Sequence, residues 1–159
     1  ELNNAVAAVH QQMALTDVLL HQGRTAQRHL DQAAEADGAE TLGQLATTGL
    51  VHASSGNAQS ARDVAAKFRE TFTNPGAQWL PNAIVAMALL SEDKPQEALN
   101  ELDGANPSIP LVQVLMSQAY AALNRPAAAA AKRQDAVGNR VILLANMYEM
   151  FALGLVQQD

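Results

Sequence analysis

The side chains in this sequence most suited to binding a metal ion are its four histidines, His10, His21, His29 and His52. His10 and His21 lie eleven residues apart, about 16 Å along a helix axis, so a single ion could not bind both. Asp17 and His21 are four residues apart and would share a helix face, but two ligands without a third do not make a metal site. The chain has no cysteine that could supply a thiolate ligand. We therefore expect no bound metal.

Carboxylate and hydroxyl groups that could take part in catalysis also lack a supporting arrangement. Glu35, Asp37 and Glu40 cluster at the end of a predicted helix and in a loop, where carboxylates are ordinarily solvated. The run Ser54-Ser55-Gly56 follows a helix rather than a strand, so it does not form the nucleophile elbow of a hydrolase. The glycines form no phosphate-binding loop. We therefore expect that the chain is not an enzyme and uses no cofactor.

The composition is that of one folded domain. The chain has 159 residues, of which 48% are hydrophobic, and this is enough for a single buried core. Its formal charge is −6 and it has no cluster of Lys and Arg, which argues against nucleic acid as a partner. No apolar run approaches roughly 18 residues, so we expect no membrane span.

The first residue and the amino-acid composition both bear on where the protein is located. The first residue is Glu1 rather than Met, which indicates a processed protein or an excised piece of a longer one. Few lysines and abundant Ala, Gln and Asn favour an exported bacterial protein. We therefore expect a periplasmic or other extracytoplasmic location, with the cytoplasm as the open alternative.

Short breaker clusters recur between stretches that are compatible with helices. The residues taken as equivalent turn positions, at spacings of 33, 37 and 31, are Gly23, Gly56, Asp93 and Asn124. Gly, Asn and Asp are the residues that best tolerate a left-handed backbone after a helix. Small residues lie seven positions earlier, at Thr16, Gly49, Ala86 and Ser117. Five positions later lie Arg28, Ala61, Ala98 and Ala129. This pattern predicts four helical hairpins whose two helices cross closely.

The predicted secondary structure is entirely α-helical. The expected helices span 2–21, 24–36, 40–54, 58–72, 77–91, 95–104, 110–123 and 126–138. A further helix over 139–158 is apolar nearly all round, so it must be buried. It could cap the last hairpin, fill a groove or pair with another chain. The side chains expected on that surface are Leu144, Tyr148, Phe151 and Leu155.

The hairpin pattern resembles the tetratricopeptide repeat (TPR) family over roughly residues 8 to 138. That repeat has about 34 residues, a small residue within its first helix and an Ala early in its second. The best matches here are Gly49, Gly56 and Ala61. The resemblance implies a single domain over 1–159, a right-handed α-solenoid of about four hairpins closed by the terminal helix. Its approximate repeats are 2–36, 40–72, 77–104 and 110–138. A related helical-hairpin solenoid is the nearest alternative.

The resemblance also implies that the first helix of each hairpin lines a concave groove. The groove residues would be Met13, Asp17, Leu20, His21, Leu50, Ala83, Met87, Leu90, Val114 and Gln118. An exposed apolar surface of this kind usually marks an interaction site, and its guest would be an apolar helix or peptide of another protein. The expected function is therefore that of a protein-interaction scaffold, or an assembly or secretion-linked chaperone.

Two other functions remain open at this point. In one, the chain is a structural module that forms a homodimer or larger oligomer through its apolar helix at 139–158. In the other, it is a regulatory domain that binds a small ligand. The predicted groove could also be shallow and partly filled by the chain's own terminal helix.

Overall fold

The computed structural model describes residues 2–20, 22–37 and 41–138, and these residues form an all-α fold without strands. The helices are α1 (Leu2–Leu19), α2 (Gly23–Asp37), α3 (Leu42–Ser54), α4 (Ala58–Thr71), the short 3₁₀ helix η1 (Pro75–Ala77), α5 (Trp79–Ser91), α6 (Pro95–Leu102), α7 (Pro110–Ala122) and α8 (Pro126–Gly138). The predicted α-helix bounds are confirmed to within two residues at each end. His21 and the terminal helix predicted at 139–158, with Leu144, Tyr148, Phe151 and Leu155, lie outside the described residues.

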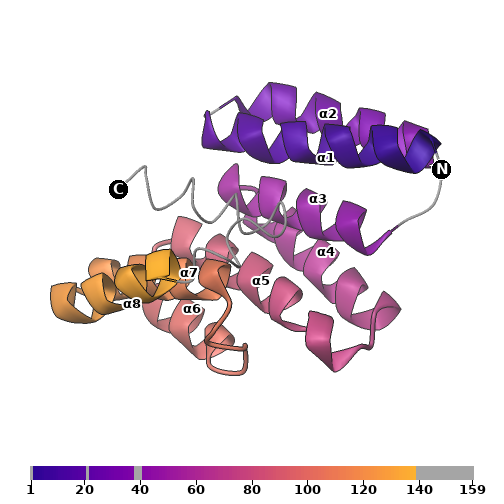
Figure 1. The fold of residues 1–159 in the computed structure, drawn as a ribbon. Helices are drawn as coiled ribbons and strands as arrows, with labels where there is room; N and C mark the ends of the chain where they lie inside the picture. The colour runs from indigo at the N-terminus through magenta and orange to yellow at the C-terminus, as the bar shows by residue number, and fades with distance from the viewer. Residues whose placement is uncertain (1, 21, 38–40, 139–159) are drawn as a thin grey trace.

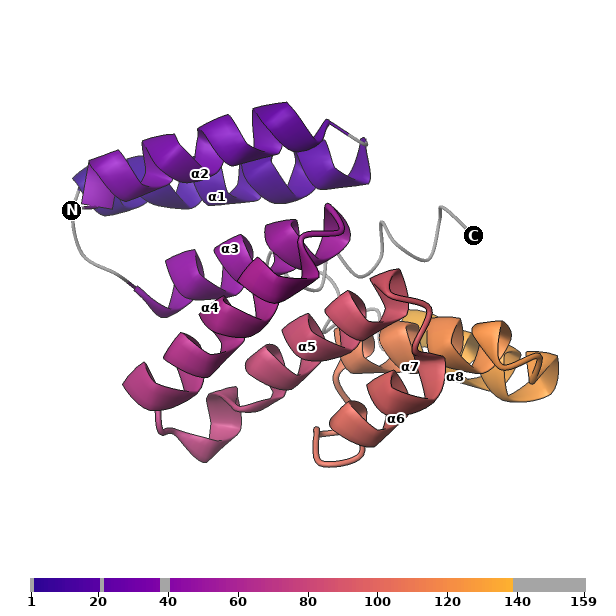
Figure 2. The same ribbon diagram turned by 180° about the vertical axis from the view of Figure 1, so that it is seen from behind.

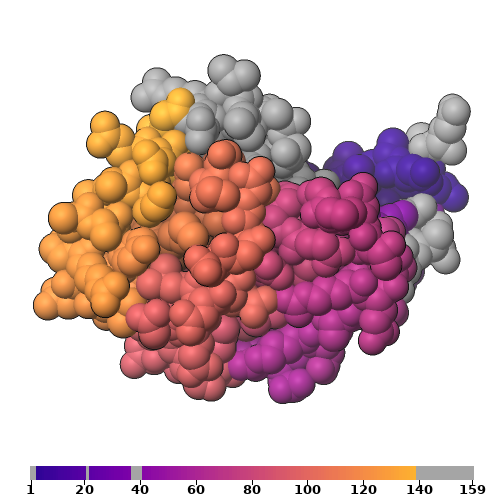
Figure 3. Space-filling model, turned by 90° about the horizontal axis from the view of Figure 1, so that it is seen from below, coloured from indigo at the N-terminus to yellow at the C-terminus, as the bar shows by residue number. Residues whose placement is uncertain are grey.

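The helices pack as successive pairs along the chain. Each first helix contacts its own second helix, so that α1 packs with α2, α3 with α4, α5 with α6 and α7 with α8. The first helices also contact one another in order, from α1 through α3 and α5 to α7. Figures 1 and 2 show the α1/α2 pair as the outermost layer, next to α3 and α4. Seen from below, the later pairs follow in chain order across one face (Figure 3).

Three of the four predicted turn residues have the left-handed backbone expected of them. The positive φ angles are 77° at Gly56, 60° at Asp93 and 56° at Asn124. After each of these residues, the next amide donates to the carbonyl oxygen five residues earlier. These hydrogen bonds join Asn57 to His52, Lys94 to Leu89 and Arg125 to Tyr120, each at 2.9 Å. Such a bond ends a helix by satisfying a carbonyl that the last turn leaves free.

In the first hairpin the equivalent hydrogen bond lies two residues earlier. A turn at Gly23 would make Arg24 the donor, but the donor is Gln22. Here the amide of Gln22 donates to the carbonyl oxygen of Asp17 at 2.7 Å. Gly23 is instead the first residue of α2. The prediction of Gly23 as the first turn residue is therefore wrong, because α1 ends before the chain reaches the glycine.

Shifting the alignment of the first hairpin by two residues restores the pattern of small residues. Thr16 and Arg28, which the uncorrected alignment placed at the helix crossing, are both exposed. Two residues before each of them lie Ala14 and Ala26, and both of these are 0% exposed. The corrected hairpin thus has small residues at the same two positions as the other three hairpins.

Close approach between helices depends on these small residues. A Cβ atom built on Gly49 of α3 would lie 2.5 Å from Cδ1 and 3.0 Å from Cγ1 of Ile84 in α5. Ile84 is itself 0% exposed, so it has no free space into which to move. Contacts this short are repulsive in a close-packed core.

We predict that Gly49→Ala destabilises the protein by about 1–3 kcal/mol, because the added methyl group overpacks the α3–α5 contact. Chemical denaturation followed by circular dichroism measures the change. Gly23→Ala is the matched control, since its Cβ would lie 3.6 Å from the Ser55 hydroxyl, an ordinary contact. We expect that control to change stability by less than about 1 kcal/mol. Equal stability of the Gly49→Ala variant and the wild type would contradict the packing.

Candidate functional site

The middle of the predicted groove is packed inside the protein. Four of its residues belong to the hydrophobic core and are at most 7% exposed, namely Leu50, Ala83, Met87 and Val114. Leu90 and Gln118 are half-buried. The four core side chains stabilise the fold and Leu90 packs against them, while a docking role for all six residues stays a prediction.

The remaining described members of the predicted groove lie in or beside α1. Met13 is 42% and Leu20 is 59% exposed. Asp17 is half-buried, and its carboxylate faces α2, where Oδ2 lies 3.6 Å from Nε2 of His29. The structure therefore separates Met13 and Leu20, which face solvent, from the core members of the set.

Exposed large hydrophobic side chains gather on α1 and on the residue that follows it. Among the described residues they are Val6 at 41%, Val9 at 58%, Met13 at 42% and Leu20 at 59%. Together with the exposed Thr16 they follow one another at alternating steps of three and four residues. That spacing places all five on one helix face, as in the contact seam of a coiled coil. We call Val6, Val9, Met13, Thr16 and Leu20 the α1 row.

The face of α1 opposite this row is buried in the fold. Ala7, Gln11, Ala14 and Leu15 are at most 5% exposed. Gln11 faces α3, because a Cβ atom built on Gly43 would lie 3.0 Å from its Oε1. The helix therefore has two apolar seams, of which the described part of the chain covers one.

The other first helices carry the same row at the same distances before their turns. In α3 and its flanks the row is Thr41, Gln44, Thr48, Val51 and Ser55. For α5 it is Gln78, Pro81, Val85, Ala88 and Glu92, and for α7 it is Ile109, Val112, Met116, Ala119 and Leu123.

These equivalent rows lie against the second helix of the preceding hairpin. From the α3 row, Gln44 donates its side-chain amide to the carbonyl oxygen of Ala33 in α2 at 3.2 Å. From the α5 row, Glu92 forms an ion pair with Arg62 of α4. In the α7 row, Val112 and Ala119 are 0% exposed, and α7 packs against α6. The α1 row therefore has the position that packs on a preceding helix in the other hairpins, and among the described residues it is exposed instead.

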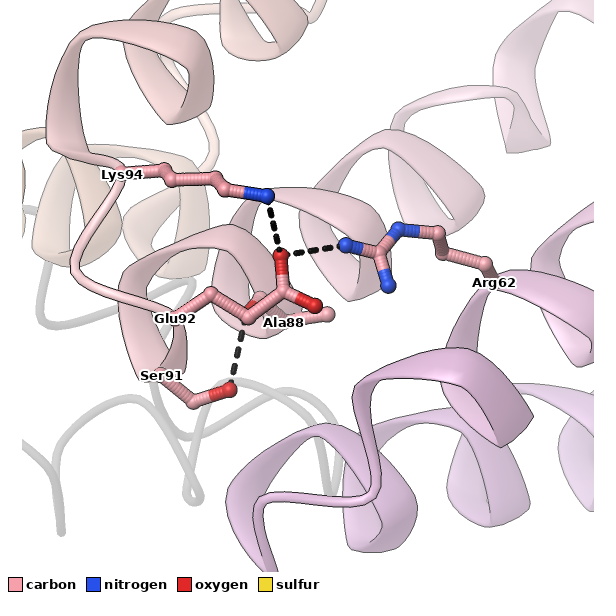
Figure 4. A network of polar contacts seen from close by, with 5 residues as sticks. All are labelled: Arg62, Ala88, Ser91, Glu92 and Lys94. Carbon is pink, nitrogen blue, oxygen red and sulfur yellow. Dashed lines mark hydrogen bonds and ion pairs between the residues drawn. The ribbon is translucent and has the colours of Figure 1, made fainter.

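An ion-pair network marks the edge of one such contact (Figure 4). The carboxylate of Glu92 accepts hydrogen bonds from Arg62 of α4 and, at 3.0 Å, from Nζ of Lys94. The hydrogen bonds from Arg62 and then Lys94 lower the pKa of Glu92 to about 2. The same contact raises the pKa of Arg62. An ion pair between α4 and α5 thus accompanies the packing of the α5 row on α4.

Three polar side chains fix the first hairpin internally. His29 of α2 lies between His10 and Asp17 of α1, with its Nδ1 3.1 Å from Nδ1 of His10 and the two rings stacked at 5.3 Å. Nδ1 of His29 also lies 3.0 Å from Oε1 of Gln32. Within the described ranges no group of three or more His, Asp and Glu side chains is placed to hold a metal ion. The contacts of His29 with His10 and Asp17 join α2 to the middle of α1.

A small cavity lies between the first two hairpins. Its volume is about 210 Å³, and its lining includes Leu30, Ala33, Leu45 and Val64. Pockets that enclose drug-sized ligands usually measure about 300–1,000 Å³. The cavity does not favour a small-ligand function over protein binding.

Sequence reasoning missed two residues of the exposed seam, Val6 and Val9. The candidate positions follow the groove that the TPR resemblance implies, and neither valine belongs to that set. The signal that could have found them is the alternating three- and four-residue spacing from Val6 to Leu20.

Comparison with known proteins gives no relative: no protein-family model, curated protein or solved structure matches this chain. Among the described helices, none has the length and apolar character needed to cross a bilayer.

We predict that Glu92→Gln lowers the melting temperature at neutral pH and has a smaller effect in acid. The pKa of Glu92 is about 2 in the folded state and is 4.5 without its partners. A depressed folded-state pKa stabilises the protein above pH 4.5, and this stabilisation is lost as the pH falls towards 2. Melting curves of both proteins between these limits and at neutral pH measure the difference. A constant difference at all pH values would contradict the ion-pair account.

Proposed function

We propose that this chain is a TPR-like helical-repeat module that binds another protein chain, as an interaction scaffold or an assembly or secretion-linked chaperone. The observation that carries the proposal is the α1 row. On α3, α5 and α7 the equivalent row packs on a preceding helix, whereas on α1 it faces solvent. A surface whose interior counterparts all bind helices has the spacing and chemistry to bind one itself.

The repeat pattern supports the TPR-like part of the proposal. Each hairpin combines a small residue in its first helix with an Ala early in its second, once the first hairpin is aligned at Ala14 and Ala26. The left-handed turns at Gly56, Asp93 and Asn124 recur at comparable positions. Ordered contacts between first helices are compatible with a right-handed α-solenoid.

The exposed seam has enough apolar surface to contribute to binding. Its four large side chains are each about half exposed, and covering the exposed part of each contributes roughly 1 kcal/mol. Seams with this spacing accept an amphipathic helix, whose own apolar side chains fit between those of the row. The expected partner is therefore an apolar helical face rather than a charged tail.

The homo-oligomer that the sequence suggested through 139–158 remains a separate proposal, because those residues lie outside the described ranges. It predicts that Leu144→Asp or Phe151→Asp turns an oligomer into a monomer. The α1 row makes no use of that segment.

We predict that Met13→Glu abolishes binding of the partner protein, because the charge lies in the middle of the apolar seam. Partners are first captured by cross-linking to three proteins, the wild type, Met13→Glu and Ala127→Glu. Each captured chain is then purified, and its binding to each of the three proteins is measured by titration. Ala127→Glu is the matched control, since it adds the same charge at an exposed position of α8. We expect the control to bind like the wild type and Met13→Glu to bind at least about 100-fold more weakly. If no captured chain binds directly, or if Met13→Glu binds as well as the control, the proposed function is wrong.

A further inference from the structure

We infer that the partner of the α1 row is a second copy of this chain, bound antiparallel about a two-fold axis that passes beside Met13. The inference rests on the proposed function, and it names the partner. It uses α1 and α2 together, because both helices point a row of exposed side chains away from the rest of the fold.

The α1 row is nearly symmetric about its centre. Val6 and Leu20 each lie seven residues from Met13, on opposite sides of it. In an antiparallel pair centred on Met13, Val6 of one copy therefore lies beside Leu20 of the other, and the two Met13 side chains meet. No charged residue belongs to the row, so two copies meet there without like-charge repulsion.

A second row on the outer face of α2 complements itself in the same antiparallel sense. Its members are exposed and lie four, three and four residues apart, in the order Arg24, Arg28, Asp31 and Glu35. The basic half precedes the acidic half. An antiparallel copy therefore sets Arg28 against Asp31 and Arg24 against Glu35, whereas a parallel copy would set like charges together.

The two rows share one level along the hairpin, so a single axis serves both. His29 of α2 contacts His10 and Asp17 of α1, which stand on either side of Met13. His29 also lies between Arg28 and Asp31 in the sequence. The centre of the charged row is therefore level with the centre of the apolar row.

Both rows also face the same way. On α1 the row lies opposite Gln11, which faces α3. On α2 the charged row lies opposite Leu30 and Ala33, which line the cavity shared with α3 and α4. Figures 1 and 2 show the two helices side by side as the outermost layer of the molecule. Together they form one outer face with an apolar half and a charged half.

The size of this face fits a small, reversible dimer. With 18 residues, α1 is about 27 Å long, and two adjacent helices are about 20 Å wide. The face therefore measures about 540 Å² on each copy, and about 1,100 Å² is buried in total, near the lower limit for specific interfaces. Because a two-fold contact uses the same face on both copies, the assembly closes at two chains.

Sedimentation velocity over a wide range of concentration tests the dimer. We expect the wild type to pass from a 16.8 kDa monomer to a species of twice that mass as the concentration rises. Met13→Glu sets two charges against each other at the axis and should raise the dimer dissociation constant at least about 100-fold, while Ala127→Glu leaves it unchanged. Circular dichroism spectra and melting temperatures confirm that each variant is folded. A wild type that stays monomeric at every concentration overturns the inference.

Charge reversal tests the pairing of α2 with α2. Arg28→Glu and Asp31→Arg should each weaken the dimer, by about 10-fold, because each sets like charges together in two symmetric places. The double variant restores opposite charges and should bind within a few-fold of the wild type. Both positions are exposed, so the variants keep their fold. A double variant weaker than either single variant overturns the pairing.

Cysteine cross-linking tests the antiparallel direction, since the chain has no cysteine of its own. A mixture of Val6→Cys and Leu20→Cys chains should form mixed disulfide dimers, because only an antiparallel pair brings these positions together. Cross-linking of either variant with itself in preference to the mixture overturns the inference. Failure here leaves the proposed function standing if another protein binds the wild type and loses binding with Met13→Glu. If the wild type neither forms this dimer nor binds another protein through the α1 row, both the further inference and the proposed function are overturned.

Discussion

The contact on which the rest of this structure depends is the packing of each first helix on the second helix of the preceding hairpin. Gln44 reaches Ala33 across one such contact, and Glu92 reaches Arg62 across the next. A short helical hairpin cannot bury both of its apolar faces alone, so each pair is stabilised by its neighbour. On α1 the surface equivalent to these contacts is exposed, and no described helix packs on it.

Small residues make this packing possible, and they explain the unusual composition. Gly49, Ala86 and Ser117 are buried in first helices, and Ala61, Ala98 and Ala129 are buried in the second helices of the same hairpins. Gly49 lies against Ile84 of α5, and the Ser117 hydroxyl donates to the carbonyl oxygen of Ala129. Aromatic residues make up only 4% of the chain because the spaces between its helices are narrow. The first hairpin follows the same rule with Ala14 and Ala26. Alanine also favours the helical state itself, so local propensity and packing act in the same direction.

Much of this fold could be predicted from the sequence because its local signals are strong. Pro95 and Pro126 begin α6 and α8. The left-handed residues Gly56, Asp93 and Asn124 follow the ends of α3, α5 and α7. The first hairpin was misaligned because Gly23 is the nearest glycine, although the helix ends earlier and Gln22 donates to Asp17. A glycine signals a permissive position without fixing which residue takes the turn.

The site was harder to predict than the fold for a physical reason. Both seams of α1 are apolar in sequence, since Ala7 and Ala14 lie on one face and Val9 and Met13 on the other. Which seam is covered depends on where the other hairpins stack. Leu50 and Met87 show the converse, because residues that read as groove lining are core residues in the folded chain.

Oxidation of Met13 by dilute peroxide, followed by peptide mass mapping, tests most directly whether the α1 row is a binding surface. Met87 is an internal control in the same chain, because it is 7% exposed whereas Met13 is 42% exposed. We predict that Met13 oxidises quickly in dilute protein and slowly in concentrated protein, where the row is covered, while Met87 reacts slowly in both. The binding role of the α1 row would be contradicted if Met13 oxidised at the same rate at both concentrations and if no added protein slowed that rate.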